Sequence, residues 1–95
     1  MPVLRIEHAV SDYDSWKRAF DGDPADRKGR GVRNYQIARD VEDPNFVMID
    51  LEFDTQGEAE GLLAVMRGVW AGPGKDVMRN PQARIVDTVE RVQLR

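Results

Sequence analysis

Hydrophobic and polar residues alternate along four segments of the chain, a pattern typical of β-strands whose two faces are used differently. In residues 3–10, one face carries Leu4, Ile6, His8 and Val10. The alternation is clearest in residues 46–53, where one face carries Val47, Ile49, Leu51 and Phe53. Residues 32–39 and 83–95 alternate in the same way. We therefore expect four strands, with the two faces named above turned toward the core.

A first helix is expected directly after the strand at residues 3–10. Ser11 and Asp14 form an S-x-x-D capping pattern, and Asp12 adds negative charge to the first turn, where the helix dipole favours it. We therefore expect the helix to begin near Asp12. Its stripe at helical spacing comprises Tyr13, Trp16, Lys17 and Phe20, the lysine contributing its apolar stem.

A second helix is expected over residues 54–70. Thr55 and Glu58 form a T-x-x-E capping box at its start. The apolar stripe that follows comprises Ala59, Leu62, Leu63, Met66, Val69 and Trp70. Glycines within this segment each weaken the helix by up to about 1 kcal/mol relative to alanine, so packing has to hold it in place.

Segments rich in glycine and proline separate these elements. Residues 21–31, "DGDPADRKGRG", end the first helix, with a second helical turn around residues 25–28 as an alternative. Residues 40–45, "DVEDPN", predict the turn of a hairpin. Residues 71–81, "AGPGKDVMRNP", are expected to form a loop.

The element order βαββαβ predicts the architecture. Two right-handed crossovers place four strands in an antiparallel sheet of spatial order 4-1-3-2, with both helices on one face. We therefore expect a ferredoxin-like α+β fold formed by one domain that spans residues 1–95. A domain of this length buries only about 60–70% of its unfolded surface, which favours further stabilisation by oligomerisation.

The sheet face away from the helices is neither polar nor apolar throughout. It is expected to carry Val3, Phe46 and Met48 beside Arg5, Glu7, Asp50 and Glu52. Arg5 and Asp50 lie on the two central strands, where they can form an ion pair. A mixed face of this kind suits stacking on a second copy of the chain, so we predict a homodimer formed through the sheet faces.

Composition narrows the classes of partner. The chain has 17 acidic and 14 basic residues and a net charge of −3, and Asp50 and Glu52 occupy the face that a nucleic-acid-binding sheet would need. The apolar run at residues 62–66 is far shorter than the ~20 residues of a membrane span. No export signal is visible, and the lack of cysteine fits a reducing compartment. We expect a cytoplasmic protein that binds neither nucleic acid nor membranes.

Residues 26–33, "DRKGRGVR", form a basic cluster in which four of eight side chains are cationic. Short charge runs are usually solvated. We therefore interpret this cluster as a solvated loop, with contact to an anion as the alternative.

His8 is the first candidate for chemistry, because it is the only histidine in the chain and an imidazole titrates near neutral pH. At the end of a strand, on its helix-facing side, it could act as acid or base toward a ligand beneath the helices. The alternative is structural: one hydrogen bond from its ring to a backbone carbonyl would fix the strand-to-helix corner.

Aromatic and basic side chains are the candidates for binding such a ligand. Tyr13 and Trp16 could line a pocket from the first helix, although aromatic stripes at this spacing more often belong to a core. Trp70, last on its helix, could close the pocket mouth. Tyr35 and Arg39 share a strand face and could hold a carboxylate or phenolate. Arg33 on the same face is better explained as a surface charge at a strand end.

We expect no metal and no other cofactor. His8 has no second nitrogen ligand for zinc or iron, and Glu7 points to the opposite strand face. The sequence contains no G-x-G-x-x-G, no P-loop and no G-x-S-x-G motif, so nucleotide-dependent and serine-hydrolase mechanisms have no support.

Three stretches resemble a known family: "HAVSDYDSWKRAFD", "YQIARDVEDPNFVMIDLEFDT" and "MRGVWAGPG". They look like the dimeric α+β barrel proteins related to antibiotic biosynthesis monooxygenases, in a subgroup of small bacterial proteins of mostly unassigned function. The likeness covers nearly the whole chain. It implies a dimeric barrel with a pocket between each sheet and its helices, where His8 would lie. It implies no single reaction, because the family includes oxygenases, isomerases, haem-degrading enzymes and proteins of no known activity.

The resemblance disfavours haem degradation and is compatible with oxygenation. Haem-degrading members use an asparagine on the first strand, a tryptophan inside the second helix and a histidine near its end. Here those positions correspond to His8 and to Gly61 or Leu62, and no histidine follows residue 8. Members that oxidise polycyclic phenols need no metal or flavin, because the deprotonated substrate itself reduces oxygen.

Two functions follow from these observations. The first is a cofactor-independent monooxygenase or isomerase that acts on an aromatic or polyketide-like substrate, with His8 as its acid or base. The second is a homodimer that binds a ligand without catalysis or serves only as structure, with His8 as a packed corner residue.

Overall fold

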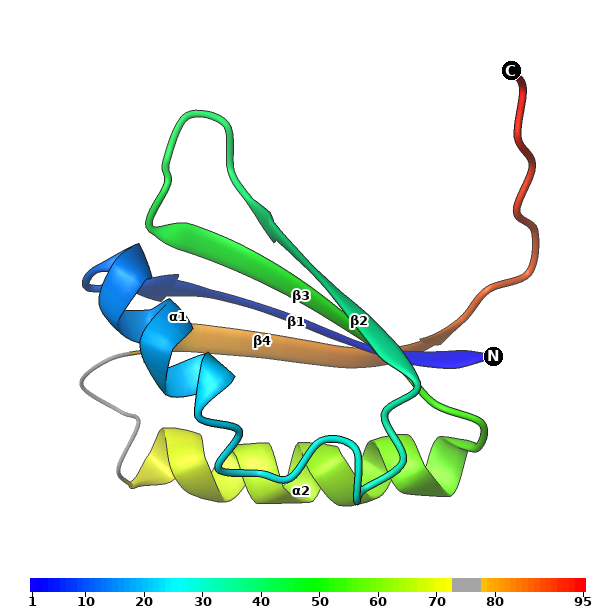
Figure 1. Cartoon of the computed structure of the whole chain (residues 1–95), viewed down its shortest axis with the longest axis horizontal. Helices are drawn as coiled ribbons and strands as arrows, with labels where there is room; N and C mark the ends of the chain where they lie inside the picture. The colour runs from blue at the N-terminus through cyan, green and yellow to red at the C-terminus, as the bar shows by residue number, and fades with distance from the viewer. Residues whose placement is uncertain (73–77) are drawn as a thin grey trace.

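The structure, a computed structural model, describes residues 1–72 and 78–95. The predicted order of elements is confirmed (Figure 1). The strands are β1 (Pro2–Val10), β2 (Asn34–Arg39), β3 (Phe46–Glu52) and β4 (Met78–Asp87), and the helices are α1 (Tyr13–Asp21) and α2 (Gln56–Ala71).

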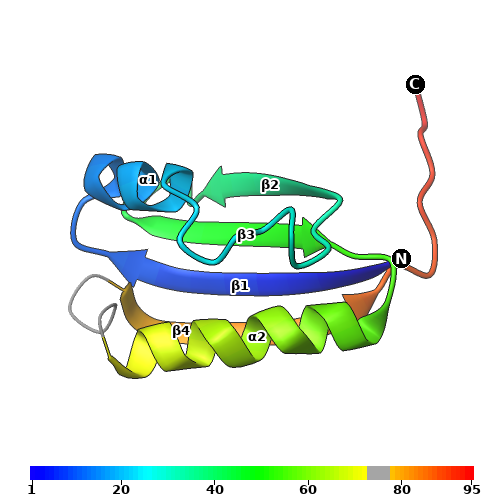
Figure 2. The same ribbon diagram turned by 60° about the horizontal axis from the view of Figure 1, so that its bottom comes forward.

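The four strands form one antiparallel sheet in the order β2-β3-β1-β4. Both helices lie on the same face of this sheet, with α2 along β1 and β4, and α1 toward β2 and β3 (Figures 1 and 2). The ferredoxin-like α+β fold predicted from the sequence is therefore confirmed, including its strand order.

The helix-facing side of the two central strands forms the core. β1 and β3 pair with Leu4 opposite Leu51 and Ile6 opposite Ile49. The buried side chains on the helix-facing side of these strands and of the residue after β3 are Leu4, Ile6, His8, Val10, Val47, Ile49, Leu51 and Phe53, whereas Val3 is buried on the opposite face of β1. These are the residues that the alternation assigned to the core, and Ala59, Leu62 and Leu63 of α2 are buried against them.

The predicted ion pair occupies the opposite face of the sheet. Arg5 on β1 lies directly opposite Asp50 on β3. The guanidinium donates from Nε to Oδ1 at 2.9 Å and from Nη2 to Oδ2 at 3.1 Å. This bidentate geometry pairs one positive and one negative charge of the open face across the two central strands.

The capping prediction is confirmed for α2 and wrong in detail for α1. Thr55 and Glu58 form the complete capping box. In α1 the N-cap is Asp12, whose carboxylate accepts a hydrogen bond from the Ser15 amide at 3.0 Å. Asp12 is the extended residue from which the helix starts (φ −154°), so it occupies the capping position that the S-x-x-D pattern assigned to Ser11.

The segment between α1 and β2 contains turns and no second helix. Asp23 and Asp26 have left-handed backbones, with φ of 54° and 53°. A left-handed residue interrupts a right-handed helix, so the alternative of a helical turn around residues 25–28 is met only by a single turn, in which the Arg30 amide donates to the Asp26 carbonyl at 3.0 Å. The expected hairpin turn at residues 40–45 is confirmed by the antiparallel pairing of β2 with β3.

β4 begins earlier than the sequence indicated. Residues 71–81 were expected to form a loop, and residues 73–77 among them lie outside the described part of the chain. From Met78 onward the chain pairs with β1, although a register shift interrupts the ladder. Asn80, with φ of 51°, and Pro81 lie at this irregularity. An edge strand tolerates a proline and a bulge, and β4 is an edge strand.

β4 also ends earlier than predicted. Its last residue, Asp87, pairs with Pro2, the first residue of β1. The alternating pattern predicted a strand to residue 95, but within residues 1–72 and 78–95 no strand pairs with residues 88–95, which are exposed. Figure 1 shows them leaving the sheet as an extended tail. β-branched residues cannot maintain a strand without a partner strand.

Gly61 provides a test of the α2 assignment. It is exposed, and a Cβ added there meets nothing within 4 Å. We expect Gly61→Ala to raise the free energy of unfolding by about 0.5–1 kcal/mol, because alanine restricts the unfolded chain. Urea titration measures this change. Gly31→Ala is the contrasting control, since φ is +98° there and the new Cβ would collide with the Glu58 side chain. Gly31→Ala should lower the free energy of unfolding. A lower free energy of unfolding in Gly61→Ala would contradict an exposed helix face at this position.

Candidate functional site

A cavity of about 280 Å³ lies between the helices and the sheet face that they cover. The sheet contributes Ile6, His8, Ile49, Leu51 and Met78 to its lining, and the helices contribute Trp16, Ala19, Phe20, Leu62, Val65, Met66 and Val69. The loop after α1 adds Pro24, Ala25 and Arg27. The cavity is therefore lined by the core strands, both helices and one loop, and it opens to solvent.

Nearly all of this lining is apolar. Among the described lining residues, His8 and Arg27 alone carry an ionisable side chain. An apolar cavity with a few polar groups is the usual form of a small-molecule site, in which the polar groups set orientation and specificity. These two side chains therefore decide what the cavity can bind and what it can do to a ligand.

The hydrogen bond that His8 makes determines which ring nitrogen can act as a base. His8 has only 1% of its surface exposed, and Nδ1 lies 3.2 Å from the carbonyl oxygen of Ala9. A carbonyl only accepts hydrogen bonds, so Nδ1 carries the proton of the neutral ring and Nε2 holds the lone pair. The Trp16 ring packs against the imidazole edge at 5.8 Å between centroids.

Burial sets the charge of His8. It lowers the pKa of the imidazole below its ordinary value of 6.5, and the hydrogen bond to Ala9 offsets only part of this effect. The ring is therefore neutral at neutral pH. A neutral imidazole with its lone pair on Nε2 can accept a proton from a bound ligand.

The lowered pKa of His8 predicts a pH dependence of stability. Below pH 6.5 the unfolded chain takes up a proton on His8 while the folded chain does not. The free energy of unfolding should therefore fall as the pH is lowered from 6.5 to the pKa of the folded state, by at most about 1.4 kcal/mol per pH unit. Urea titrations between pH 7.5 and 5 measure this slope. His8→Gln should lack it, and an equal slope in that variant would contradict the assignment.

Trp16 lies in the cavity wall, whereas Tyr13 and Arg39 do not line the cavity. Tyr13 is half-buried and contacts the Trp16 ring at 5.9 Å. The Arg39 guanidinium lies over the Tyr13 ring at 4.3 Å from its centroid. These two residues form a cation–π pair that supports the outer side of α1.

Tyr35 and Trp70 also lie beside the cavity without lining it. Tyr35 is 43% exposed, and its ring meets the Phe20 ring at 5.2 Å in an edge-to-face contact. Trp70 is half-buried at the end of α2, and its Nε1 is buried without a hydrogen-bond partner in the described structure. Arg33 pairs with Asp54 at the surface, in agreement with its interpretation as a surface charge.

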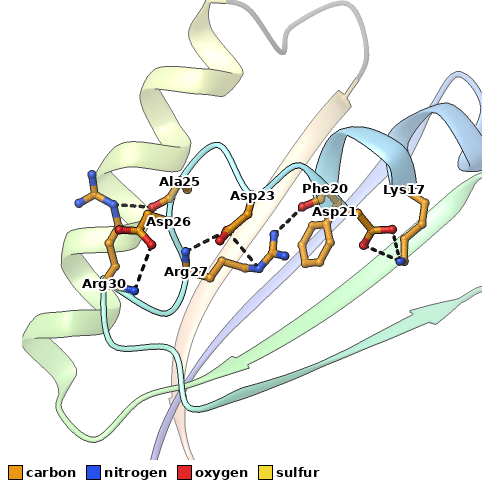
Figure 3. Close-up of polar contacts among 9 residues, drawn as sticks. Lys17, Phe20, Asp21, Asp23, Ala25, Asp26, Arg27 and Arg30 are labelled. Carbon is orange, nitrogen blue, oxygen red and sulfur yellow. Dashed lines mark hydrogen bonds and ion pairs between the residues drawn. The ribbon is translucent and has the colours of Figure 1, made fainter.

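Arg27 is the lining residue that the sequence interpretation missed. It belongs to the basic cluster that we expected to be solvated, but only 15% of its side chain is exposed. Figure 3 shows the Arg27 side chain lying along the loop beside Phe20, with the Asp23 carboxylate next to it. A charge run does not show which of its members turns inward. The i, i+4 spacing of Asp23 and Arg27 was a weak signal, because it allows the Asp23 carboxylate to pair with the Arg27 guanidinium.

The described residues contain no group of three or more His, Asp or Glu side chains that could hold a metal ion. They also contain no helix long and apolar enough to cross a membrane.

Comparison with solved structures identifies the fold family. A variant of SnoaB, described as a cofactor-independent oxygenase from Streptomyces nogalater, matches with a TM-score of 0.77 over 96% of this chain and 95% of its own, at 10% identity. A candidate antibiotic biosynthesis monooxygenase from Nitrosomonas europaea matches with a TM-score of 0.71 over 95% of this chain and 100% of its own, at 16% identity. PA3566 from Pseudomonas aeruginosa matches with a TM-score of 0.69 over 94% of both chains, at 10% identity.

No family model and no curated protein sequence matches the chain. At identities of 10–16%, the structural likeness establishes the fold and no specific activity. The chain therefore has the ferredoxin-like α+β fold of the antibiotic biosynthesis monooxygenase-like proteins, the fold that its sequence resemblance implied.

Proposed function

We propose that the chain is a cofactor-independent oxygenase that oxidises a small phenol in the cavity, with His8 as general base. The observation that carries this proposal is the state of His8. Its Nδ1 proton is directed to the Ala9 carbonyl, which leaves the lone pair on Nε2, and the imidazole belongs to the lining of a cavity that is otherwise almost entirely apolar. The fold shared with a cofactor-independent oxygenase supports the same reaction class.

The proposed reaction uses dioxygen as its oxidant. Nε2 takes the proton of the phenol, and the phenolate transfers one electron to dioxygen. The two radicals combine at a ring carbon to form a C–O bond, and protonated His8 returns its proton to the peroxide. Loss of the ring C–H proton and cleavage of the O–O bond then give a quinone and water. One phenol and one dioxygen yield one quinone and one water.

Labelled dioxygen tests this reaction. With 1-naphthol and ¹⁸O₂, we expect oxygen uptake, one labelled oxygen in the quinone, and the same rate with or without a metal chelator. An anaerobic incubation is the control and should yield no quinone. Absence of oxygen uptake with one-ring and two-ring phenols would contradict the proposal. It would instead favour the non-catalytic function, in which the Ala9 hydrogen bond serves only to fix the corner.

We also propose that residues 1–95 form one domain that dimerises through the open face of the sheet. Phe46 and Met48 of the central strand β3 are only half-buried there, and both point away from the helices. The Arg5–Asp50 ion pair neutralises two of the charges on this face, and Glu7 lies opposite Met48. An apolar patch with paired charges suits contact with a second copy.

Sedimentation measures the predicted dimer. We expect the wild-type chain to sediment as a dimer at micromolar concentration. Met48→Glu should convert it to a folded monomer, because each copy would bury an unpaired carboxylate in the interface. Glu7→Gln, on the same face, is the control and should stay dimeric. A monomeric wild type, or a dimeric Met48→Glu, would contradict this interface.

A further inference from the structure

Arg27 is held rigidly at the edge of the cavity. Its Nη1 donates to the carbonyl oxygen of Phe20 at 2.7 Å, and its Nε lies 3.5 Å from Oδ1 of Asp23. The guanidinium carbon lies 3.8 Å from the centroid of the Phe20 ring and 5.1 Å from that of Tyr35. Figure 3 shows the Arg27 side chain beside Phe20 and the Asp23 carboxylate. The charged group is thus positioned before any ligand arrives.

This positioning leaves part of the guanidinium unused. Its neighbours engage Nη1 and Nε, while Nη2 has no hydrogen-bond partner in the described structure. An arginine has five N–H donors and no acceptor, so a free edge of this group suits an anionic oxygen. Arg27 is also the one cation among the described lining residues.

An aromatic wall joins Arg27 to His8. The His8 ring contacts Trp16 at 5.8 Å, and Trp16 contacts Phe20 at 5.2 Å. Arg27 then lies over Phe20. A flat ligand along this wall would have one end near the base and the other near the cation.

The size of the cavity limits the ligand. A cavity of ~150 Å³ takes up one benzene ring. The present volume of about 280 Å³ therefore corresponds to about two rings. This is smaller than the polycyclic or polyketide-like substrate that the sequence resemblance suggested.

We propose that the cavity selects an aromatic acid of about two rings, whose carboxylate binds Arg27 while its opposite ring edge faces His8. The orientation toward His8 rests on the proposed oxygenase function. The preference for a carboxylate rests on Arg27 alone. Arg27 is a binding residue in this proposal and takes no part in proton transfer.

A pair of matched ligands tests the preference. 2-Naphthoate and 2-naphthamide have the same rings and nearly the same shape, but only the first carries a charge. Titration calorimetry on the wild-type protein should show naphthoate binding at least tenfold more tightly. Equal affinities, tighter binding of the amide, or binding of neither ligand would overturn the proposal. This comparison needs no variant.

Two loop variants then assign the preference to Arg27. Arg27→Gln should bring the two affinities within about threefold of each other. Arg30→Gln is the matched control, because Arg30 is exposed on the same loop and donates to the Ala25 carbonyl without lining the cavity. It should keep the wild-type preference. If Arg27→Gln does not fold, Arg27→Lys replaces it, and its preference for naphthoate should be severalfold smaller than that of the wild type. An undiminished preference in the folded Arg27 variant would overturn the assignment.

The same measurements separate this proposal from the oxygenase function. His8→Gln should keep the preference for naphthoate, because the carboxylate does not contact the imidazole. A preference for naphthoate without oxygen uptake on phenols would contradict the oxygenase function and leave the Arg27 proposal standing. Oxygen uptake without a preference for naphthoate would contradict only the Arg27 proposal.

Discussion

Replacing His8 by glutamine should lower kcat/KM for oxidation of the phenol by about 10²–10⁴-fold, the usual contribution of a general base. Glutamine keeps a polar side chain of similar length in this buried position but cannot take up a proton. The phenolate would then have to form without a base near its hydroxyl. Initial rates of oxygen uptake, measured at pH 7.5 on purified wild-type and variant protein, give this ratio.

Two controls show whether the loss of rate comes from chemistry or from folding. His8→Gln should remain folded, because a loss of about 1–2 kcal/mol leaves most domains of 5–15 kcal/mol stability intact. Glu7→Gln changes the neighbouring residue, whose side chain lies on the open face of the sheet, and should leave kcat/KM unchanged. A folded His8→Gln variant with the wild-type rate would show that His8 is a corner residue and not the base.

Replacing Trp16 by alanine should produce the largest loss of stability that we predict. Trp16 is 4% exposed, packs between the His8 and Phe20 rings, and is the buried residue through which α1 joins the core. Truncation of a large buried aromatic side chain costs about 3–5 kcal/mol. For a domain of this size, each kcal/mol lowers Tm by about 4–8 °C. Thermal unfolding followed by circular dichroism measures the shift.

Trp16→Phe distinguishes loss of packing from loss of aromatic character. It keeps a ring against His8 and Phe20, and we expect it to cost less than half as much as Trp16→Ala. It should also preserve binding of 2-naphthoate. A Trp16→Ala variant that unfolds at the wild-type temperature would contradict the role of Trp16 in anchoring α1 over the cavity.

The parts of the fold that were predictable are those in which burial repeats along the chain. Leu4 and Ile6 on β1, and Ile49 and Leu51 on β3, alternate because one face of each strand is covered by helices. The same pattern placed Arg5 and Asp50 on the open face of the two central strands, where the structure pairs them. A period of two residues therefore indicated the core and the face of each side chain, whereas the register between the strands came from the structure.

The ends of β4 were not predictable from local pattern. Where the strand ends depends on where β1 begins, since Asp87 pairs with Pro2 and no strand partner remains beyond it. Where it starts depends on a bulge at Asn80 and Pro81, residues that usually indicate a loop. Both limits are set by the partner strand, which the sequence of β4 does not contain.

The candidate site was predictable in part. His8 and Trp16 line the cavity because alternation and helical spacing indicated their faces correctly. Arg27 was missed because its direction depends on left-handed turns at Asp23 and Asp26 and on stacking over Phe20. Those contacts form only when the loop folds back onto α1, and no periodic pattern reports them.

Nitrogen NMR of His8 tests the central claim most directly, because a single histidine makes the signals unambiguous. The structure predicts a neutral ring with the proton on Nδ1, a titration midpoint below 6.5, and a change in the Nε2 signal when a phenol is added. The claim would be contradicted by a proton on Nε2, by a titration midpoint at or above 6.5, or by an Nε2 signal that does not change when the phenol is added.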